Sequence, residues 1–225
     1  MLFSQQILSF FRRLDFPLIL PKGIEVMDPF RDATTMEICT RFYDKYYSDN
    51  DKRRMIIGIN PGRFGGGVTG IPFTDPVRLK RECGIDNPWP PKQELSSVFM
   101  YDMMRAYGGA AAFYKKIYIT SISPLGFTKD NKNLNYYDDK TLQQDIRPFV
   151  IKCFEQQFKF GIHRDTAFCL GDGKNFQYLS KLNKEIKLFD TIIPLSHPRF
   201  IMQYRLKKKQ EYIDYYIKQF NDHCI

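Results

Sequence analysis

Four short apolar runs recur along the chain, and each one ends abruptly in asparagine, serine or glycine. They cover residues 55–59, 117–120, 166–170 and 191–195. Runs of four or five apolar or β-branched residues between such breaks are typical of strands that are buried on both faces of a parallel sheet. We therefore predict four core strands.

Outside these runs, apolar residues recur at helical spacing in several stretches. They cover residues 1–14, 98–107, 139–160 and 206–220, and a further helix is expected after Gly173. In the third stretch Pro148 predicts a kink. Strands that alternate with helices predict an α/β fold, specifically a three-layer α/β/α sandwich with a largely parallel central sheet.

The chain shows no internal repeat and no long linker, so residues 1–225 are expected to form one domain with the N-terminal helix packed on it. No stretch of eighteen apolar residues predicts a membrane span. The five cysteines are scattered, without a C-x-x-C pair, which argues against a disulfide framework, a zinc site or an iron–sulfur cluster. These features predict a reduced cytoplasmic protein.

The charge balance adds a hint about partners. Thirty-four Lys and Arg against twenty-five Asp and Glu give a formal net charge of +9. Such an excess favours a polyanionic partner such as nucleic acid, although it serves solubility equally well.

Polar residues directly follow the predicted strands. They are Asn60, Ser121 with Ser123, Gly171 with Asp172, and His197. Ligands of open parallel sheets bind beyond the carboxyl ends of the strands, so these residues are the first candidates for a site. Proline comes directly after Asn60, Ser123 and His197 and restricts the backbone before it.

The first of these strands leads into a glycine-rich segment. Residues 58–73 read G-I-N-P-G-R-F-G-G-G-V-T-G-I-P-F. Glycines allow a backbone to approach a ligand closely. The segment is neither G-x-G-x-x-G nor a Walker loop, so the usual phosphate-binding motifs do not explain it.

This segment resembles the first motif of the single-strand-selective monofunctional uracil-DNA glycosylases, approximately G-M-N-P-G-P-F-G-M-x-x-T-G-V-P-F. Residues 196–200, S-H-P-R-F, are similar to a shortened form of that family's H-P-S-P-R. Residues 120–125, T-S-I-S-P-L, look like its H-N-x-C-P-L, with serine in place of asparagine at position 121. The resemblance covers about residues 50–205 and implies a glycosylase that flips a deaminated base from DNA and hydrolyses its N-glycosidic bond.

The resemblance also implies roles for single residues. Asn60 would orient a water molecule, His197 would stabilise the departing base, and Phe73 would stack on it. The pocket wall would include Gly62, Phe64, Gly65, Gly66 and Ser121, with Ser123 as an alternative to Ser121. Asp75 is expected to cap a turn rather than act as a general base.

Contacts to DNA are expected downstream of His197. A wedge that fills the gap left by the flipped base would come from Arg199, Phe200 and Ile201, and Pro198 is expected to contact DNA with them. A basic cluster then follows at Lys207, Lys208 and Lys209; it would contact phosphates or form a solvated helix face. We expect no metal, no cofactor, a monomer, and a cytoplasmic location on the nucleoid.

Three alternatives stay open. The enzyme could act mainly on deaminated purines, with Ser121 leaving room for a larger base than asparagine would. The chain could be a catalytically silent DNA-binding module of the same fold. It could also be an enzyme of small nucleotides, although the positive charge argues mildly against this.

Overall fold

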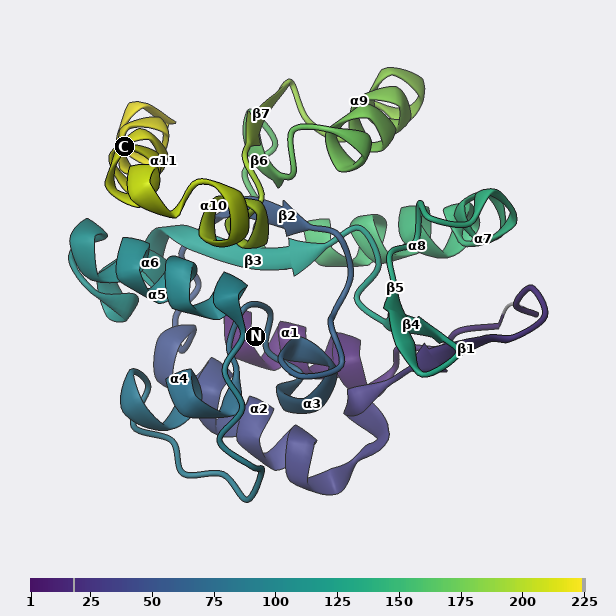
Figure 1. Cartoon of the computed structure of the whole chain (residues 1–225), viewed down its shortest axis with the longest axis horizontal. Helices are drawn as coiled ribbons and strands as arrows, with labels where there is room; N and C mark the ends of the chain where they lie inside the picture. The colour runs from purple at the N-terminus through teal and green to yellow at the C-terminus, as the bar shows by residue number, and fades with distance from the viewer. Residues whose placement is uncertain (18, 224–225) are drawn as a thin grey trace.

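A four-stranded parallel sheet forms the centre of the molecule in the computed structural model, which describes residues 1–17 and 19–223 (Figure 1). The strands lie in the order β3-β2-β6-β7. Their bounds are Arg54–Gly58 for β2, Ile117–Ser121 for β3, Thr166–Leu170 for β6 and Thr191–Leu195 for β7. All four predicted strands are thus confirmed, the last two to the residue.

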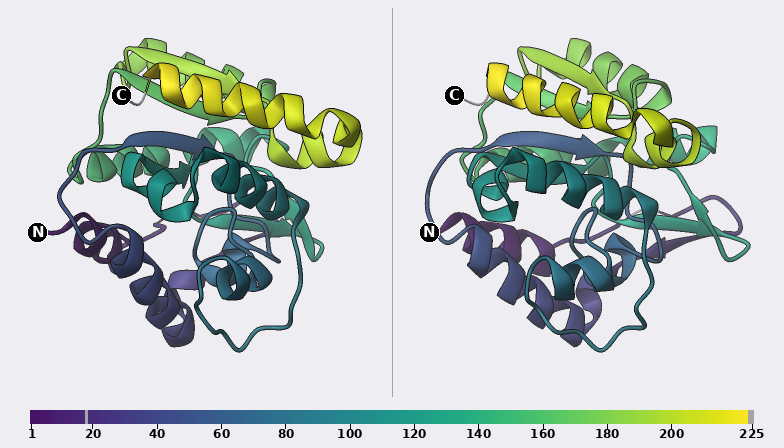
Figure 2. Two further views of the ribbon diagram at one scale, coloured as in Figure 1. Left: turned by 90° about the vertical axis from the view of Figure 1, so that its left-hand side faces the viewer. Right: turned by 60° about the vertical axis from the view of Figure 1, so that its left-hand side comes forward.

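Helices cover both faces of this sheet, as the α/β/α prediction requires (Figures 1 and 2). In Figure 1, α5, α6 and α11 lie toward the left of the sheet, α10 is drawn over its middle, α7, α8 and α9 lie to its right, and α1 to α4 lie below the edge strand β3. The bounds are Phe3–Arg12 (α1), Ala33–Tyr46 (α2), Gly66–Thr69 (α3), Pro76–Arg81 (α4), Leu95–Tyr107 (α5), Ala110–Lys116 (α6), Lys140–Asp145 (α7), Arg147–Phe158 (α8), Lys174–Ile186 (α9), Pro198–Tyr204 (α10) and Lys209–His223 (α11).

Two regions differ from the prediction in their helical structure. The stretch expected as one kinked helix forms two, because α7 ends before Ile146 and Pro148 stands in the first turn of α8, where its missing N–H costs nothing. The segment after His197, expected as a wedge loop, forms α10 instead. Ile201 is fully buried on the inner side of α10 and cannot act as a wedge.

A second, antiparallel sheet was not predicted. It has the order β1-β4-β5 and contains Ile24–Met27 (β1), Gly126–Lys129 (β4) and Lys132–Leu134 (β5). Figure 1 shows this sheet at the lower right, beside the carboxyl ends of the central strands. It therefore borders the edge of the central sheet where a site is expected.

Buried apolar side chains form one continuous cluster that extends from Phe3 in α1 to Phe220 in α11. The predicted N-terminal helix is part of it, with Phe3 and Ile7 fully buried. Cys39, Cys83, Cys153 and Cys169 are buried free thiols, and Cys224 lies outside the described residues.

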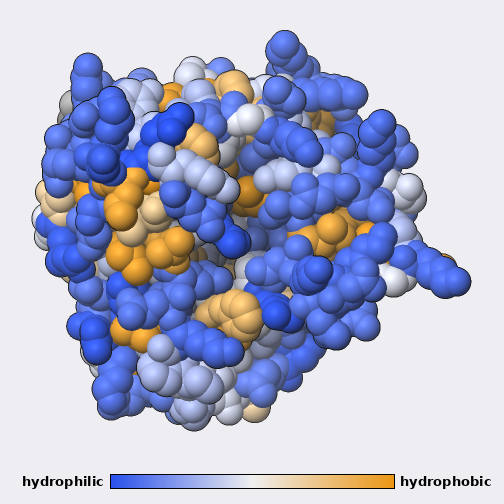
Figure 3. Space-filling model, in the orientation of Figure 1, coloured by the Kyte–Doolittle hydropathy of each residue, from blue (hydrophilic) through white to orange (hydrophobic). Residues whose placement is uncertain are grey.

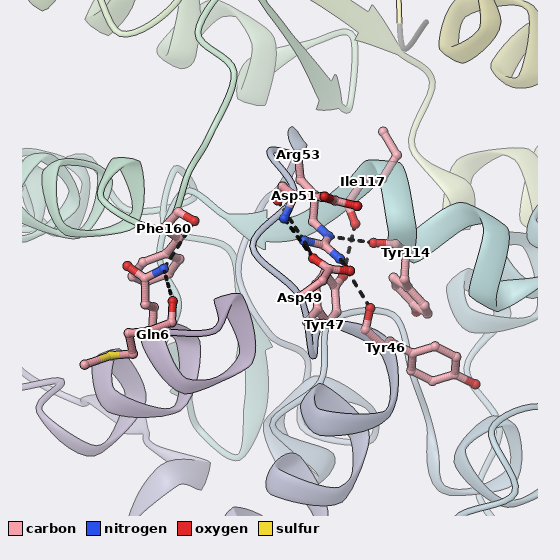
Figure 4. Close-up of polar contacts among 10 residues, drawn as sticks. Gln6, Tyr46, Tyr47, Asp49, Asp51, Arg53, Tyr114, Ile117 and Phe160 are labelled. Atoms are coloured by element: carbon pink, nitrogen blue, oxygen red, sulfur yellow. Dashed lines mark hydrogen bonds and ion pairs between the residues drawn. The ribbon is translucent and has the colours of Figure 1, made fainter.

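A buried guanidinium joins the N-terminal helices to the start of β2 (Figure 4). Arg53 donates to both carboxylate oxygens of Asp49, at 2.8 and 3.0 Å, and to the carbonyl oxygen of Tyr114 at 2.8 Å. Its guanidinium also lies over the rings of Phe3 and Tyr47. A buried charge is tolerated only when it is paired in this way, so Arg53 fixes the approach to β2 and to the residues that follow it.

Candidate active site

The carboxyl ends of the central strands open into a cavity of about 500 Å³. Asn60 follows β2, Ser121 ends β3, Asn175 lies beyond β6 and His197 follows β7, and all four line this cavity. Because parallel strands end at one edge of a sheet, residues far apart in sequence meet here.

Among the residues predicted for the site, some line the cavity and some do not. Those that line it are Asn60, Gly62, Gly66, Phe73, Ser121, His197, Arg199 and Phe200. Those that the structure leaves outside its lining are Phe64, Gly65, Ser123, Pro198, Lys207, Lys208 and Lys209.

The Asn60 side chain is held by the backbone of the second sheet and the turn after it. Its Oδ1 accepts from the Tyr136 N–H at 2.9 Å, and its Nδ2 donates to the Leu134 carbonyl oxygen at 3.1 Å. These two bonds fix which end of the amide is oxygen. A carbonyl-type oxygen has two lone pairs, so Oδ1 keeps one acceptor position for a further donor such as water.

His197 caps α10 and is held in one protonation state. Its Nδ1 accepts from the Arg199 N–H at 3.1 Å, so the neutral ring carries its proton on Nε2. Burial, with a smaller effect of the Arg199 charge, lowers the pKa of His197 from 6.5 to about 4, although Asp172 opposes the shift. At neutral pH the ring is therefore an uncharged hydrogen-bond donor.

Phe73 is held in a strained backbone conformation, with φ at +53°. For a residue other than glycine this costs roughly 1 kcal/mol or more, and such strain is concentrated at functional sites. Its ring lies so close to Gly58 that a Cβ atom there would be 3.2 Å from Cε2, and its centroid is 6.0 Å from that of His197. The conformation thus places an aromatic face on the cavity wall beside His197.

The two serines after β3 have different environments. Ser121 lines the cavity, and its hydroxyl has no hydrogen-bond partner within the described chain. Ser123 is fully buried, and its hydroxyl donates to the Leu125 carbonyl oxygen at 2.7 Å. The expectation that Ser123 is an alternative base contact is therefore corrected: its hydroxyl closes a turn.

The glycine-rich segment contributes less than the motif implied. Gly62 and Gly66 line the cavity, whereas Phe64 lies outside with 40% of its surface exposed. The Phe64 ring instead contacts two cations, with the Arg63 guanidinium 4.7 Å and the Lys92 Nζ 4.6 Å from its centroid. Phe64 was expected in the pocket wall, but it belongs to a cationic cluster on the surface.

Glu94, which directly precedes α5, lines the cavity and was not predicted. A Cβ atom on Gly65 would overlap its carboxyl oxygens, so this glycine leaves the space that Glu94 fills. Burial, reinforced by the negative charge of Asp75, raises the pKa of Glu94 from 4.5 to about 7, and the Arg199 charge opposes the shift. Asp75 itself caps α4 by accepting from the Arg78 N–H at 2.8 Å, as the turn-capping expectation required.

A buried asparagine in α9 was also missed. The Asn175 Nδ2 donates to the carbonyl oxygens of Leu170 at 2.9 Å and Gly58 at 3.3 Å, and its Oδ1 accepts from the Tyr136 hydroxyl at 2.8 Å. These bonds join β2, β6 and the segment that holds Asn60. The predicted strand exit at Gly171 and Asp172 pointed to this region, though not to Asn175.

The residues predicted to contact DNA divide into two groups. Arg199 and Phe200 reach the cavity from the first turn of α10, and Phe200 is 39% exposed, while Pro198 is buried as the first residue of that helix. Lys208 pairs with Glu211 at 3.3 Å and Lys209 with Asp102 at 2.8 Å, which leaves Lys207 exposed and without a described ion pair.

Comparison with known proteins identifies the family. Residues 45–221 match the uracil DNA glycosylase superfamily. This chain belongs to that superfamily. Among solved structures it is similar to SMUG2 of Pedobacter heparinus, with 49% sequence identity over 99% of this chain and 98% of that one, and a TM-score of 0.96. A search of curated proteins gave no match.

The predicted resemblance to the single-strand-selective branch is confirmed, and so is the predicted fold. The chain is a DNA glycosylase, a hydrolase of N-glycosyl bonds. This reaction forms a cationic sugar and places negative charge on the departing base. A glycosylase site therefore needs a hydrogen-bond donor for the base and an acceptor that orients water; among the side chains that line this cavity, His197 offers a donor and Asn60 an acceptor.

The face shown in Figure 3 is mainly hydrophilic, and its apolar side chains form small separate patches. No helix in the described part of the chain is long and apolar enough to cross a membrane. Within the same residues, no group of three or more His, Cys, Asp or Glu side chains is arranged to hold a metal ion.

Proposed function

We propose that this glycosylase flips uracil, and also hypoxanthine and xanthine, out of single- or double-stranded DNA and excises the base by hydrolysis in base excision repair. One observation carries the proposal: Asn60, Ser121 and His197, from three parallel strand ends, meet around one cavity beside the strained ring of Phe73. We further propose that the chain acts as a monomer in the cytoplasm, on the nucleoid.

In the proposed mechanism, the flipped base stacks on Phe73 and accepts a hydrogen bond from the Nε2–H of His197. A neutral donor suits this task, because the bond strengthens as negative charge builds on the base and no proton needs to be removed first. The low pKa of His197 keeps the ring in that state at neutral pH.

The remaining lone pair of the Asn60 Oδ1 would orient the attacking water. The bonds to Tyr136 and Leu134 hold this amide in one orientation, so its position is set before DNA binds. A cationic sugar needs only a weak nucleophile, and orientation alone supplies much of the rate.

Ser121 would set a broader base specificity than an asparagine in its place. A single unpaired hydroxyl donates or accepts as the base requires, and its small volume leaves room for a purine. Arg199, Phe200 and Lys174, all at the cavity, would contact the DNA on either side of the flipped nucleotide.

The test uses purified protein and end-labelled oligonucleotides that contain uracil, 5-hydroxymethyluracil, hypoxanthine or xanthine in single and double strands. Alkali-labile cleavage after incubation measures base release. We expect release of uracil and of at least one purine in one of the two strand contexts. A shift in DNA mobility with every base still attached would instead identify a silent binding module.

A further inference from the structure

The Glu94 carboxyl enters the cavity from a different side than the proposed catalytic side chains. Asn60, Ser121 and His197 come from the edge of the sheet, whereas Glu94 comes from the start of α5, across the glycine-rich segment. Its carboxyl group fills space over Gly62 and Gly65: a Cβ atom on Gly62 would be 3.2 Å from Oε1.

The backbone of Glu94 is firmly anchored. Its N–H donates to the Asp75 Oδ2 at 2.9 Å, and its carbonyl oxygen accepts from the Val98 N–H at 3.0 Å in the first turn of α5. The side chain does not cap that helix, although Glu94 stands at the capping position. Helix capping therefore does not explain why a carboxyl group occupies this wall.

Neither carboxyl oxygen of Glu94 has a hydrogen bond or ion pair within residues 1–17 and 19–223. A half-buried carboxyl without a partner is costly, and such groups are concentrated at functional sites. The charged groups that act on it are Asp75 at the start of α4 and Arg199 in α10, with opposite effects, and burial outweighs both. As a result its pKa is near 7, so that the group is protonated in a large fraction of molecules at neutral pH.

Purines and uracil differ in what they offer to an acid at this wall. If Ser121 and His197 contact the six-membered ring from the sheet edge, the opposite side of the base faces Gly62 and Glu94. A purine has the acceptor N7 in its second ring, whereas the corresponding edge of uracil has only carbon-bound hydrogen. A proton on Glu94 therefore has a partner in purines alone.

We propose that Glu94 is the general acid for purine excision, protonating N7 of a flipped hypoxanthine or xanthine as the bond between C1′ and N9 breaks. This inference rests on the purine part of the function proposed above. The electron pair of the C1′–N9 bond goes to the base, which leaves uncharged because N7 has taken the proton. The water oxygen bonds to C1′, and the proton that it loses returns to the Glu94 carboxylate, directly or through solvent.

The experiment measures single-turnover excision of hypoxanthine, xanthine and uracil between pH 5 and pH 9. For wild type, we expect the purine-to-uracil rate ratio to fall about tenfold per pH unit above pH 7, as Glu94 loses its proton. Glu94→Gln keeps the size of the side chain but cannot transfer a proton. It should lower purine excision at pH 6 by about 10² to 10⁴ and make the ratio independent of pH.

Two further variants make the test specific. Glu185→Gln removes an exposed carboxyl in α9 that pairs with Arg147, and it should leave all rates and the pH profile unchanged. Glu94→Asp keeps an acid on a shorter side chain and should restore part of the purine activity together with its dependence on pH. Uracil excision by each preparation shows that the variant is folded.

The outcomes separate this inference from the proposed function. If wild type excises purines and Glu94→Gln does so equally well, with the same pH profile, the role of Glu94 is wrong and the proposed function stands. If uracil is released but no purine is released at any pH, both the proposed purine activity and the proposed role of Glu94 are wrong. If no base is released, the proposed function itself fails.

Discussion

Replacing Glu94 by glutamine removes one ionisable carboxyl and keeps the side chain nearly the same size. In the unfolded chain the pKa of this carboxyl has its ordinary value of 4.5, and in the folded protein burial raises the pKa to about 7. The folded state therefore binds more protons than the unfolded state between these two values, and its stability falls as the pH rises through this window.

The structure also gives the size of this effect. The two pKa values differ by about 2.5 pH units, which corresponds to an upper limit of about 3.4 kcal/mol at about 1.36 kcal/mol per unit. Glu94 is partly exposed to the cavity, so water reduces the penalty, and we expect about 1 to 3 kcal/mol. The stabilising contribution is fully present below pH 4.5 and is lost above pH 7.

Urea unfolding of wild type and Glu94→Gln at pH 5 and pH 8 measures this quantity. All other titrating groups are common to the two proteins, so the difference between their pH dependences isolates Glu94. We expect the variant to be more stable than wild type by less than about 1 kcal/mol at pH 5, near the start of this window, and by about 1 to 3 kcal/mol at pH 8. Parallel pH dependences would show that Glu94 has an ordinary pKa in the folded protein.

Four further predictions concern the proposed site residues and the basic cluster. His197→Ala should lower single-turnover uracil excision by about 10² to 10³ with little change in DNA affinity, and excision near the wild-type rate would remove His197 from the mechanism. Asn60→Ala should cause a similar or larger loss, measured in the same assay; weak DNA binding instead would make Asn60 a binding residue. Ser121→Asn should raise uracil excision relative to hypoxanthine by about 1 kcal/mol or more in activation free energy, and an unchanged ratio would show that Ser121 does not contact the base. The affinity for undamaged DNA should fall with rising salt concentration, with a log–log slope of about −0.9 per phosphate contacted. If charge reversal at Lys207, Lys208 and Lys209 leaves this slope unchanged, these lysines are solvated surface residues that do not contact DNA.

The sequence predicted the central sheet well because its strands are continuous apolar runs between sharp breaks. Strands β6 and β7 have the predicted bounds; β2 begins and ends one residue earlier than predicted, and β3 ends one residue later. The second sheet escaped prediction because β1 and β5 are short and carry polar residues, so that their pairing depends on tertiary contacts. The helix α10 was missed because it has only seven residues and buries only Pro198 and Ile201, which is too little for a periodic pattern.

The site was predictable where its residues directly follow strands. Asn60, Ser121 and His197 were found in this way, and the family motif added Phe73. Glu94 lies in a proline-rich segment that belongs to no strand, and its position depends on how that segment folds back over Gly62 and Gly65. Its raised pKa depends in turn on that burial, so no local feature of the sequence indicates it.

Burial shifts the pKa values of His197 and Glu94, which both line the cavity, in opposite directions. It lowers the pKa of His197 to about 4 and raises that of Glu94 to about 7, and in each case it is the largest cause. Between these values both side chains are uncharged, and both carry a proton that they can donate. These two side chains can therefore stabilise charge on a departing base without adding a charge of their own. Because desolvation produces both shifts, a substitution that admits water would return both groups toward their ordinary values of 6.5 and 4.5, and Glu94 would then be ionised at neutral pH. The apolar wall that Phe73 provides next to His197 thus contributes to the protonation state of the site as well as to stacking.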